Sequence, residues 1–246
     1  MKIVNVFIYY KGMDKVQRVI DIAINLRDKL NASHFDFDGF VYNPFDYAFE
    51  NYMSYVALAV KDGQKALFMG MNPGPFGMVQ TGVPFGEINA VKDYLGINNP
   101  VGKPKRESPL RPVDGMNCKR SEVSGARFWD MAKKFGTRDE FFSSVTVINY
   151  CPLAFISNSG TNITPVELSK NDRLIVERIC DESLSKTLDV LDVPVRIAIG
   201  RYAEEKLSEF GKTELFLHPS PRNPKSRLFW PDGALNALKE LINDQW

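Results

Sequence analysis

The sequence predicts a three-layer α/β/α fold around a central, mostly parallel four-stranded sheet. Four short apolar runs bounded by Gly, Pro or Asn have the character of strands buried on both faces: 66–69, 145–148, 195–199 and 215–217. Helical patterns lie between these runs, and strands that alternate with helices form parallel sheets. No stretch is long or polar enough to be a linker, so we expect one domain over residues 1–246.

The region before the first strand is expected to be helical and to cover the sheet. Apolar residues recur at helical spacing from about residue 14 to 30, and a second helix is predicted from Pro44 to Val60. A long helix is predicted over 164–191, because Thr164, Pro165 and Glu167 fit an N-cap, a first-turn proline and a capping glutamate. The other predicted helices are 87–95, 124–135, 201–210 and 232–242.

Composition excludes several classes of protein. The 246 residues are 44% hydrophobic and 25% charged, with a net charge of +1, as in soluble globular proteins. No apolar run reaches the roughly 18 residues of a transmembrane helix, and the start lacks a signal peptide, so we expect a cytoplasmic protein without a membrane partner. The three cysteines form no CxxC pair, so neither a metal nor another cofactor is expected.

Unusual polar residues follow the predicted strands. Ligands of open α/β sheets bind outside the carboxyl ends of the strands. The first strand leads to Asn72, the second to Asn149 and the fourth to His218, so these side chains are expected to meet at one mouth. The glycine-rich segment 70–77 lacks the Gly-Lys-Ser/Thr ending of a phosphate loop and the GxGxxG of a dinucleotide site. Both kinds of nucleotide-binding enzyme are therefore rejected.

An asparagine and a histidine together fit one kind of hydrolysis. An asparagine such as Asn72 can hold a water in line with a cationic sugar, and His218 can donate a hydrogen bond to a base that leaves as an anion. This pairing suits cleavage of an N-glycosidic bond. The alternative is a thiolate nucleophile at Cys151 paired with His218. The position of Cys151 beside Pro152 favours a buried structural thiol instead.

Other features fit a base taken out of DNA. The amide of Asn149 can read a nucleobase edge in two-point fashion, and Phe76 or Phe85 can stack on the ring. The rigid loop 219–224 can fill the gap that a flipped base leaves. The irregular basic segment 102–127 is either a solvated loop or a rim that tracks phosphates.

Four longer motifs carry a resemblance to a known family. They are GMNPGPFGMVQTGVPFGE (70–87), SGARFW (124–129), NYCPL (149–153) and HPSPRNP (218–224). In these motifs, and in VYNPFDYA (41–48), the chain resembles the single-strand-selective monofunctional uracil-DNA glycosylases, a branch of the uracil-DNA glycosylase superfamily. The resemblance runs from about residue 40 to the C-terminus, and residues 1–40 lie outside it.

The resemblance implies a catalytic pair and a base pocket. Asn72 matches the asparagine that positions the attacking water, and His218 matches the histidine that stabilises the departing uracil anion. The residues expected to bind the base are Gly70, Met71, Gly74, Met78, Phe85 and Asn149. Among them Phe85 matches the stacking ring and Asn149 the reader of the uracil edge. Gly74 stands where uracil-only relatives have a tyrosine, which implies room for 5-substituted uracils such as 5-hydroxymethyluracil.

The same resemblance implies contacts to DNA. Ser220, Pro221, Arg222 and Asn223 are expected to bind it, with Arg222 as the wedge that enters the vacated stack. The expected partner is single- and double-stranded DNA, acted on by a monomer that is associated with the nucleoid in a bacterium or located in the nucleus of a eukaryote. No lysine in the matching motifs is placed to form a Schiff base, which fits base removal without strand cleavage.

Alternatives remain at this stage. Tyr150 stands where the family pattern leads us to expect an aliphatic residue, and its hydroxyl near the base would alter selectivity. A glycosylase for hypoxanthine or xanthine is therefore one alternative. A non-catalytic module that binds single-stranded DNA is another, and a hydrolase of free nucleosides is a third.

Overall fold

The central sheet has the predicted parallel arrangement. The computed structural model describes residues 14–222 and 224–243. Its four-stranded sheet has the order β3-β2-β6-β7, and each neighbouring pair is parallel. The strands are β2 (Ala66–Gly70), β3 (Val145–Asn149), β6 (Val195–Ile199) and β7 (Glu214–Phe216). All four carboxyl ends therefore lie at one edge of the sheet, and the predicted fold class is confirmed.

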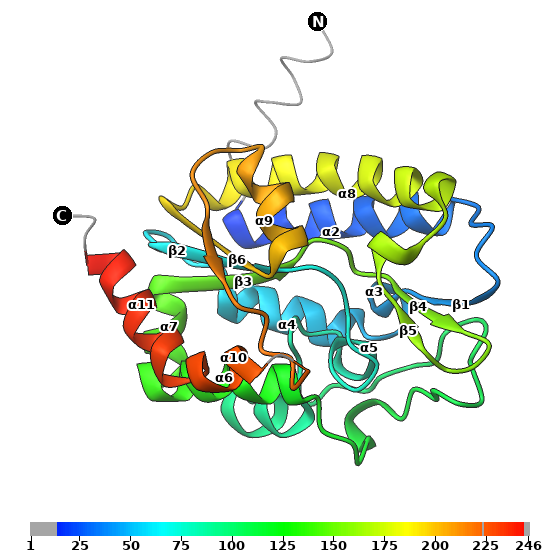
Figure 1. The fold of residues 1–246 in the computed structure, drawn as a ribbon, viewed down its shortest axis with the longest axis horizontal. Coiled ribbons are helices and arrows are strands. Elements are labelled where there is room, and N and C mark those ends of the chain that lie inside the picture. The colour runs from blue at the N-terminus through cyan, green and yellow to red at the C-terminus, as the bar shows by residue number, and fades with distance from the viewer. Residues whose placement is uncertain (1–13, 223, 244–246) are drawn as a thin grey trace, which may run out of the picture.

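Helices cover both faces of this sheet (Figure 1). One layer contains α2 (Lys15–Asn31), α8 (Lys170–Leu191) and α9 (Arg201–Ser208). The other contains α4 (Phe49–Ala59), α6 (Val123–Phe135), α7 (Arg138–Ser144) and α11 (Asp232–Asn243). The whole of β2 is buried between them, which explains why its sequence is apolar without alternation. Helix α2 is the predicted N-terminal cover and lies beside α8 (Figure 1).

A second, antiparallel sheet was not predicted. It consists of β1 (Gly39–Tyr42), β4 (Ala154–Ser157) and β5 (Asn162–Ile163), in the order β1-β4-β5. The N-terminal region is therefore not wholly helical. Strand β1 exists because Tyr42 pairs with Ala154, more than a hundred positions away, and no local pattern reveals such a pairing.

Several predicted boundaries are also wrong. The expected helix from Pro44 is divided at Ala48 into α3 (Pro44–Tyr47) and α4. The capping box of Thr164 and Glu167 exists, but it closes the short turn η3 (Pro165–Glu167). Helix α8 begins only after Ser169, whose side chain caps it. The described part of the structure also has four short helices that were not predicted: α5 (Met78–Thr81), η2 (Gly115–Asn117), α7 and α10 (Pro224–Phe229). Where an α-helix over 87–95 was expected, the chain forms the π-helical turn η1 (Ala90–Tyr94).

Two negative findings apply to the part of the chain that the structure describes. No helix in it combines the length and apolarity needed to span a bilayer. It also contains no group of three or more His, Cys, Asp or Glu side chains arranged to bind a metal ion.

Candidate active site

Gly70, Asn149 and Phe85 form a compact corner at the carboxyl ends of β2 and β3. Gly70 and Asn149 are paired in register across the two strands. A Cβ atom at position 70 would stand 2.6 Å from Asn149 Oδ1 and 2.7 Å from Phe85 Cζ. Only glycine therefore allows the amide and the aromatic ring to approach from both sides, as a site built for a flat ligand requires.

The amide of Asn149 is held from behind by a buried methionine. Its Nδ2 donates to the Sδ of Met78 at 3.2 Å, and Met78 is almost fully buried. Sulfur is a weak acceptor, so this contact orients the amide but costs little free energy to break when a ligand offers a stronger acceptor. The amide thus keeps capacity to bind a ligand edge.

The ring of Phe85 is fixed by α6. One face stacks on Phe128 with centroids 4.9 Å apart and an interplanar angle of 20°. The carbonyl of Phe85 accepts a hydrogen bond from Trp129 Nε1 at 2.9 Å. Phe85 has a positive φ of 53°, which costs a non-glycine residue about 1 kcal/mol or more. The contacts with α6 hold this strained backbone and turn the ring toward Gly70.

Asn72 lies beside the segment that joins β3 to β4. Its Nδ2 donates to the carbonyl of Leu153 in a long hydrogen bond of 3.5 Å. The backbone nearby is tied as well, because the N–H of Cys151 donates to the carbonyl of Met71 at 2.9 Å. Since the amide nitrogen is directed to Leu153, the amide oxygen of Asn72 remains the group that can accept a hydrogen bond from a water.

His218 reaches the same edge of the sheet from β7. A Cβ at Gly200 would stand 3.6 Å from the Cβ of His218, so the histidine packs over the end of β6, the strand beside β2. Gly200 has a φ of +92°, which favours glycine at this position. His218 keeps an exposed face, yet the protein around it excludes enough water to lower the pKa of its imidazole below the ordinary value.

Arg127 holds the loop that carries His218. Its Nη1 donates to the carbonyls of Pro219 and Ser220, at 3.0 and 3.3 Å. The sequence had placed Arg127 in the basic segment that was expected to be solvated or to track phosphates. The guanidinium instead connects α6 to the backbone directly after His218.

If the site releases a base from DNA, as the motif resemblance implies, replacing Arg127 with alanine should slow that release about tenfold on single- and double-stranded substrates alike. A hydrogen bond from a charged donor contributes about 1.5–3 kcal/mol, and its loss here releases the backbone beside His218. Single-turnover excision measures the rate. Salt titration of DNA binding provides the control, because losing a phosphate contact would lower the slope of log K against log[salt] by about 0.7–0.9. A change in slope without a change in rate would contradict the positioning role.

The predicted DNA-binding segment lies at the surface. The N–H of Arg222 donates to Ser220 Oγ at 3.2 Å, and Pro221 and Arg222 are exposed. Asn223, the fourth residue predicted for this contact, is outside the described residues. The turn at 220–222 therefore presents the Arg222 side chain to solvent next to the candidate site.

Glu122 occupies the space beside Gly74. A Cβ at position 74 would collide with the carboxylate of Glu122, and one at Gly77 would stand 3.0 Å from its Cγ. Burial raises the pKa of this carboxyl, and the N–H groups of Phe76 and Ser124 partly offset that shift. The room expected at Gly74 is thus lined by an acidic side chain that sequence reasoning missed. The residue stands two positions before Ser124, the first residue of the SGARFW motif, which was the available signal.

The hydroxyl of Tyr150 points to α8. It donates to Asp181 Oδ1 at 2.6 Å, and Lys206 Nζ binds the other oxygen of that carboxylate at 3.2 Å. Tyr150 is buried, and burial together with Asp181 raises the pKa of its hydroxyl strongly. The expectation that this hydroxyl lies near a bound base is therefore wrong. The tyrosine that replaces the expected aliphatic residue therefore packs between β3 and α8, where its hydroxyl binds Asp181.

Cys151 has the surroundings of a structural thiol. It is fully buried, and its Sγ accepts a hydrogen bond from the N–H of Leu153 at 3.4 Å. Its other neighbour is the buried thiol of Cys180. Full burial and the contact with Leu153 fit a structural thiol, which supports the structural interpretation over a nucleophile paired with His218.

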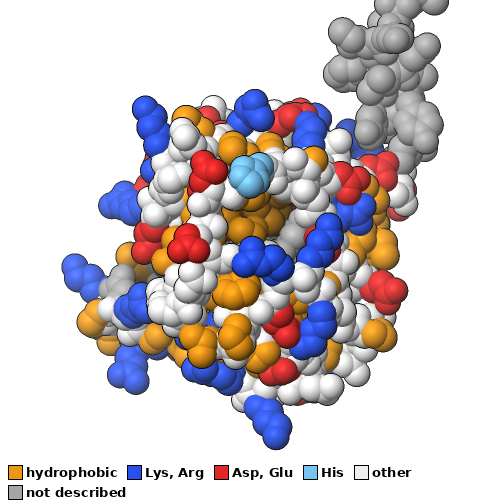
Figure 2. All heavy atoms as spheres, turned by 90° about the vertical axis from the view of Figure 1, so that its right-hand side faces the viewer, with side chains coloured by type: hydrophobic (Ala, Val, Ile, Leu, Met, Phe, Trp, Pro, Cys, Tyr) orange, Lys and Arg blue, Asp and Glu red, His pale blue; other side chains and the backbone are white. Residues whose placement is uncertain are grey.

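Charges on the side of the molecule shown in Figure 2 are mixed. Lys and Arg side chains alternate with Asp and Glu around a hollow in which hydrophobic atoms are visible. This view shows the right-hand side of Figure 1, where the chain continues from β2 into α5. Attraction of DNA to this face therefore depends on particular basic side chains and not on a uniform positive field.

Comparison with solved structures identifies the fold. The crystal structure of wild-type SMUG2 from Pedobacter heparinus matches with a TM-score of 0.62, covering 90% of this chain and 98% of that one. At 18% sequence identity this match shows a shared fold. No family model matches the chain.

Comparison with curated proteins shows the family. The single-strand selective monofunctional uracil DNA glycosylase of Bos taurus is 43% identical over 227 residues, which are 89% of this chain and 84% of the relative. The Mus musculus protein of the same name is 44% identical over 211 residues, or 82% of this chain and 76% of the relative. The chain therefore belongs to the single-strand selective monofunctional uracil-DNA glycosylases, and the family resemblance drawn from its motifs is confirmed.

Proposed function

We propose that the protein hydrolyses the N-glycosidic bond of uracil in single- and double-stranded DNA and leaves an abasic site. The observation that carries the proposal is the corner of Gly70, Asn149 and Phe85 at the carboxyl ends of β2 and β3. Asn72 follows β2 and His218 follows β7, so both come from the same edge of the sheet. The names of the relatives support the same class of reaction.

The geometry supports a division of labour among these side chains. The flipped base stacks on the open face of Phe85, and the amide of Asn149 binds its edge as both donor and acceptor. The amide oxygen of Asn72 holds a water for attack on the sugar. As the bond to the base breaks, His218 donates a hydrogen bond to the oxygen on which negative charge develops. Neither step requires a covalent link to the protein, so the DNA strand stays intact.

Glu122 bears on the range of bases. We expect uracils with a hydroxymethyl group at C5 to be accepted, because the space beside Gly74 holds the carboxyl of Glu122, which can bind a hydroxyl. The raised pKa of Glu122 favours its protonated form more than usual, and a protonated carboxyl both donates and accepts. The hydrogen bond of Tyr150 to Asp181 removes the main reason to expect hypoxanthine or xanthine as the preferred base.

Arg222→Ala is expected to weaken action on duplex DNA more than on single strands. A flipped base leaves a gap only in a stacked duplex, and an exposed arginine in the 220–222 turn is placed to fill it. The ratio of kcat/KM on the two substrates measures the effect, and we expect it to change about fivefold or more. Arg227→Ala, an exposed arginine in α10, is the control and should leave the ratio unchanged. Equal losses on both substrates would contradict the wedge role.

The rate of the chemical step is expected to fall only on the acidic side of neutral pH. The ordinary pKa of histidine is about 6.5, and that of His218 is lower, so the imidazole is neutral at pH 7 and gains a proton only at lower pH. If the neutral ring is the working donor, the single-turnover rate is flat from about pH 7 to 8 and falls below about pH 6.5. A rate that rises on acidification would show that the imidazolium is the active form.

One assay tests the function directly. An end-labelled oligonucleotide with a single uracil is incubated with the protein, and half of each sample is then treated with alkali. The proposal predicts that a shorter product appears only after alkali, because the protein makes an abasic site without cutting the strand. A product without alkali would indicate strand cleavage, and no product in either half would reject glycosylase activity.

A further inference from the structure

A second basic site lies outside the candidate active site. It is a groove of about 610 Å³ between the loop that follows β2 and the segment 101–120. Phe76 forms part of its wall, only four residues after Asn72, so the groove is joined to the candidate site by one loop. The groove is also lined by three basic side chains and one acidic one, Lys103, Lys119, Arg120 and Asp114, so its net charge is positive. Neither the catalytic pair Asn72 and His218 nor the corner of Gly70, Asn149 and Phe85 lines this groove.

A planar cation is fixed on an aromatic ring in this groove. The guanidinium carbon of Arg120 lies 3.9 Å from the centroid of Phe76, and that of Arg111 lies 5.6 Å from it. Arginine stacks on aromatic faces by cation–π attraction, and nucleobases stack on guanidinium planes in the same manner. Because Arg120 is exposed, its outer face is available to a base, and the neighbouring Lys119 is exposed as well.

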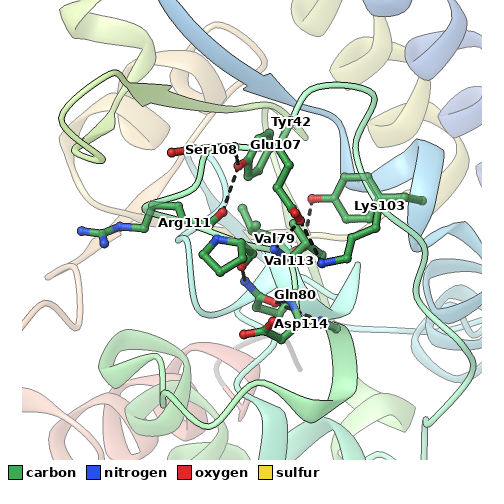
Figure 3. Close-up of polar contacts among 12 residues, drawn as sticks. Tyr42, Val79, Gln80, Lys103, Glu107, Ser108, Arg111, Val113 and Asp114 are labelled. Carbon is green, nitrogen blue, oxygen red and sulfur yellow. Dashed lines mark hydrogen bonds and ion pairs between the residues drawn. The ribbon is translucent and has the colours of Figure 1, made fainter.

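The far wall of the groove is held in place by hydrogen bonds that are buried or partly buried (Figure 3). Gln80 Oε1 accepts from the N–H groups of Asp114 and Gly115, at 2.8 and 3.1 Å, while its Nε2 donates to the carbonyl of Pro112 at 3.0 Å. Glu107 Oε1 accepts from the N–H of Val113 at 2.8 Å. This part of the basic segment 102–127 is therefore a fixed wall rather than a loosely held solvated loop, and its role in tracking phosphates stays a prediction.

We propose that this groove binds the single strand of DNA next to the target nucleotide. One unpaired base stacks on Arg120, and Lys119 contacts a phosphate beside it. Each nucleotide of a single strand offers a base that can stack and a phosphate that can bind a cation. The guanidinium plane of Arg120 and the adjacent ammonium of Lys119 match these two groups. The inference rests on the proposed function, because the strand held here is the one whose uracil would bind at the corner of Gly70, Asn149 and Phe85.

Two substitutions separate stacking from charge. Arg120→Lys keeps the charge but removes the plane, so affinity for a uracil-free single strand should fall about fivefold or more while its salt dependence stays the same. Lys119→Ala should lower the slope of log K against log[NaCl] by about 0.7, the value for one phosphate contact on a single strand. Fluorescence anisotropy of a labelled oligonucleotide in a NaCl series measures both quantities.

Lys239→Ala is the matched control, since Lys239 is exposed on α11, at the opposite side of the molecule from α5 (Figure 1). It should change neither affinity nor slope appreciably. Arg120→Lys with wild-type affinity, or Lys239→Ala with the effect of Lys119→Ala, would overturn the proposal. The DNA in this experiment contains no uracil, so its outcome does not depend on catalysis. If the uracil assay fails, the proposed function is rejected, but the binding experiment still decides whether the groove holds a single strand.

Discussion

Replacing Asn72 with alanine is expected to reduce the single-turnover rate of uracil release at least about 100-fold. The amide oxygen is the group we assign to the attacking water, and misplacing a reactant by about 1 Å costs about that much. Binding should survive, because the Phe85–Asn149 corner and the basic side chains remain. Anisotropy with uracil-containing DNA at low temperature measures binding beside the rate.

Asn98→Ala is the control for this variant, since Asn98 is an exposed asparagine after η1 and no role is assigned to it. It should behave as the wild type in both measurements. A wild-type rate in Asn72→Ala would remove the water-positioning role. A loss of binding as large as the loss of rate would indicate that Asn72 holds the base or the loop instead.

His218→Ala is expected to cost about 10²–10³ in the rate of the chemical step. That is the effect of removing one donor that stabilises charge developing on an oxygen. The loss should diminish for a base that leaves more readily, such as 5-fluorouracil, because a more stable anion depends less on the missing hydrogen bond. This dependence on the leaving group separates a catalytic role from a packing role over Gly200.

The chain provides its own control for this substitution. His34 is its other histidine; its side chain is 91% exposed, and its Nε2 lies 3.6 Å from Asp36 Oδ1. His34→Ala should retain the wild-type rate with both leaving groups. A loss of less than tenfold in His218→Ala, equal for uracil and 5-fluorouracil, would assign His218 to packing.

The parallel sheet could be predicted because its strands are buried on both faces. Runs such as 66–69 are apolar at every position, which distinguishes them from the alternating strands of an exposed sheet. The convergence of Asn72, Asn149 and His218 at one edge followed from the rule for parallel strand ends. The small sheet could not be predicted, because β1 is defined by its pairing with β4 and not by its own pattern.

Contacts over long sequence distances explain what else escaped prediction. Arg127 was read as one charge in a basic segment, but its partners are carbonyls that lie 92 and 93 positions away. The carboxylate of Glu122 could not be placed beside Gly74 from spacing alone. Helix α7, in contrast, could have been found, since Thr137 and Glu140 form a capping box that was overlooked.

A crystal structure of the protein with free uracil would test the central claim most directly, namely that one pocket holds the base and activates its departure. The account predicts a uracil ring stacked on Phe85, with the amide of Asn149 at one edge and His218 near a ring oxygen. A uracil bound instead on Arg120 in the basic groove, or one that leaves the corner of Gly70, Asn149 and Phe85 empty, would contradict it.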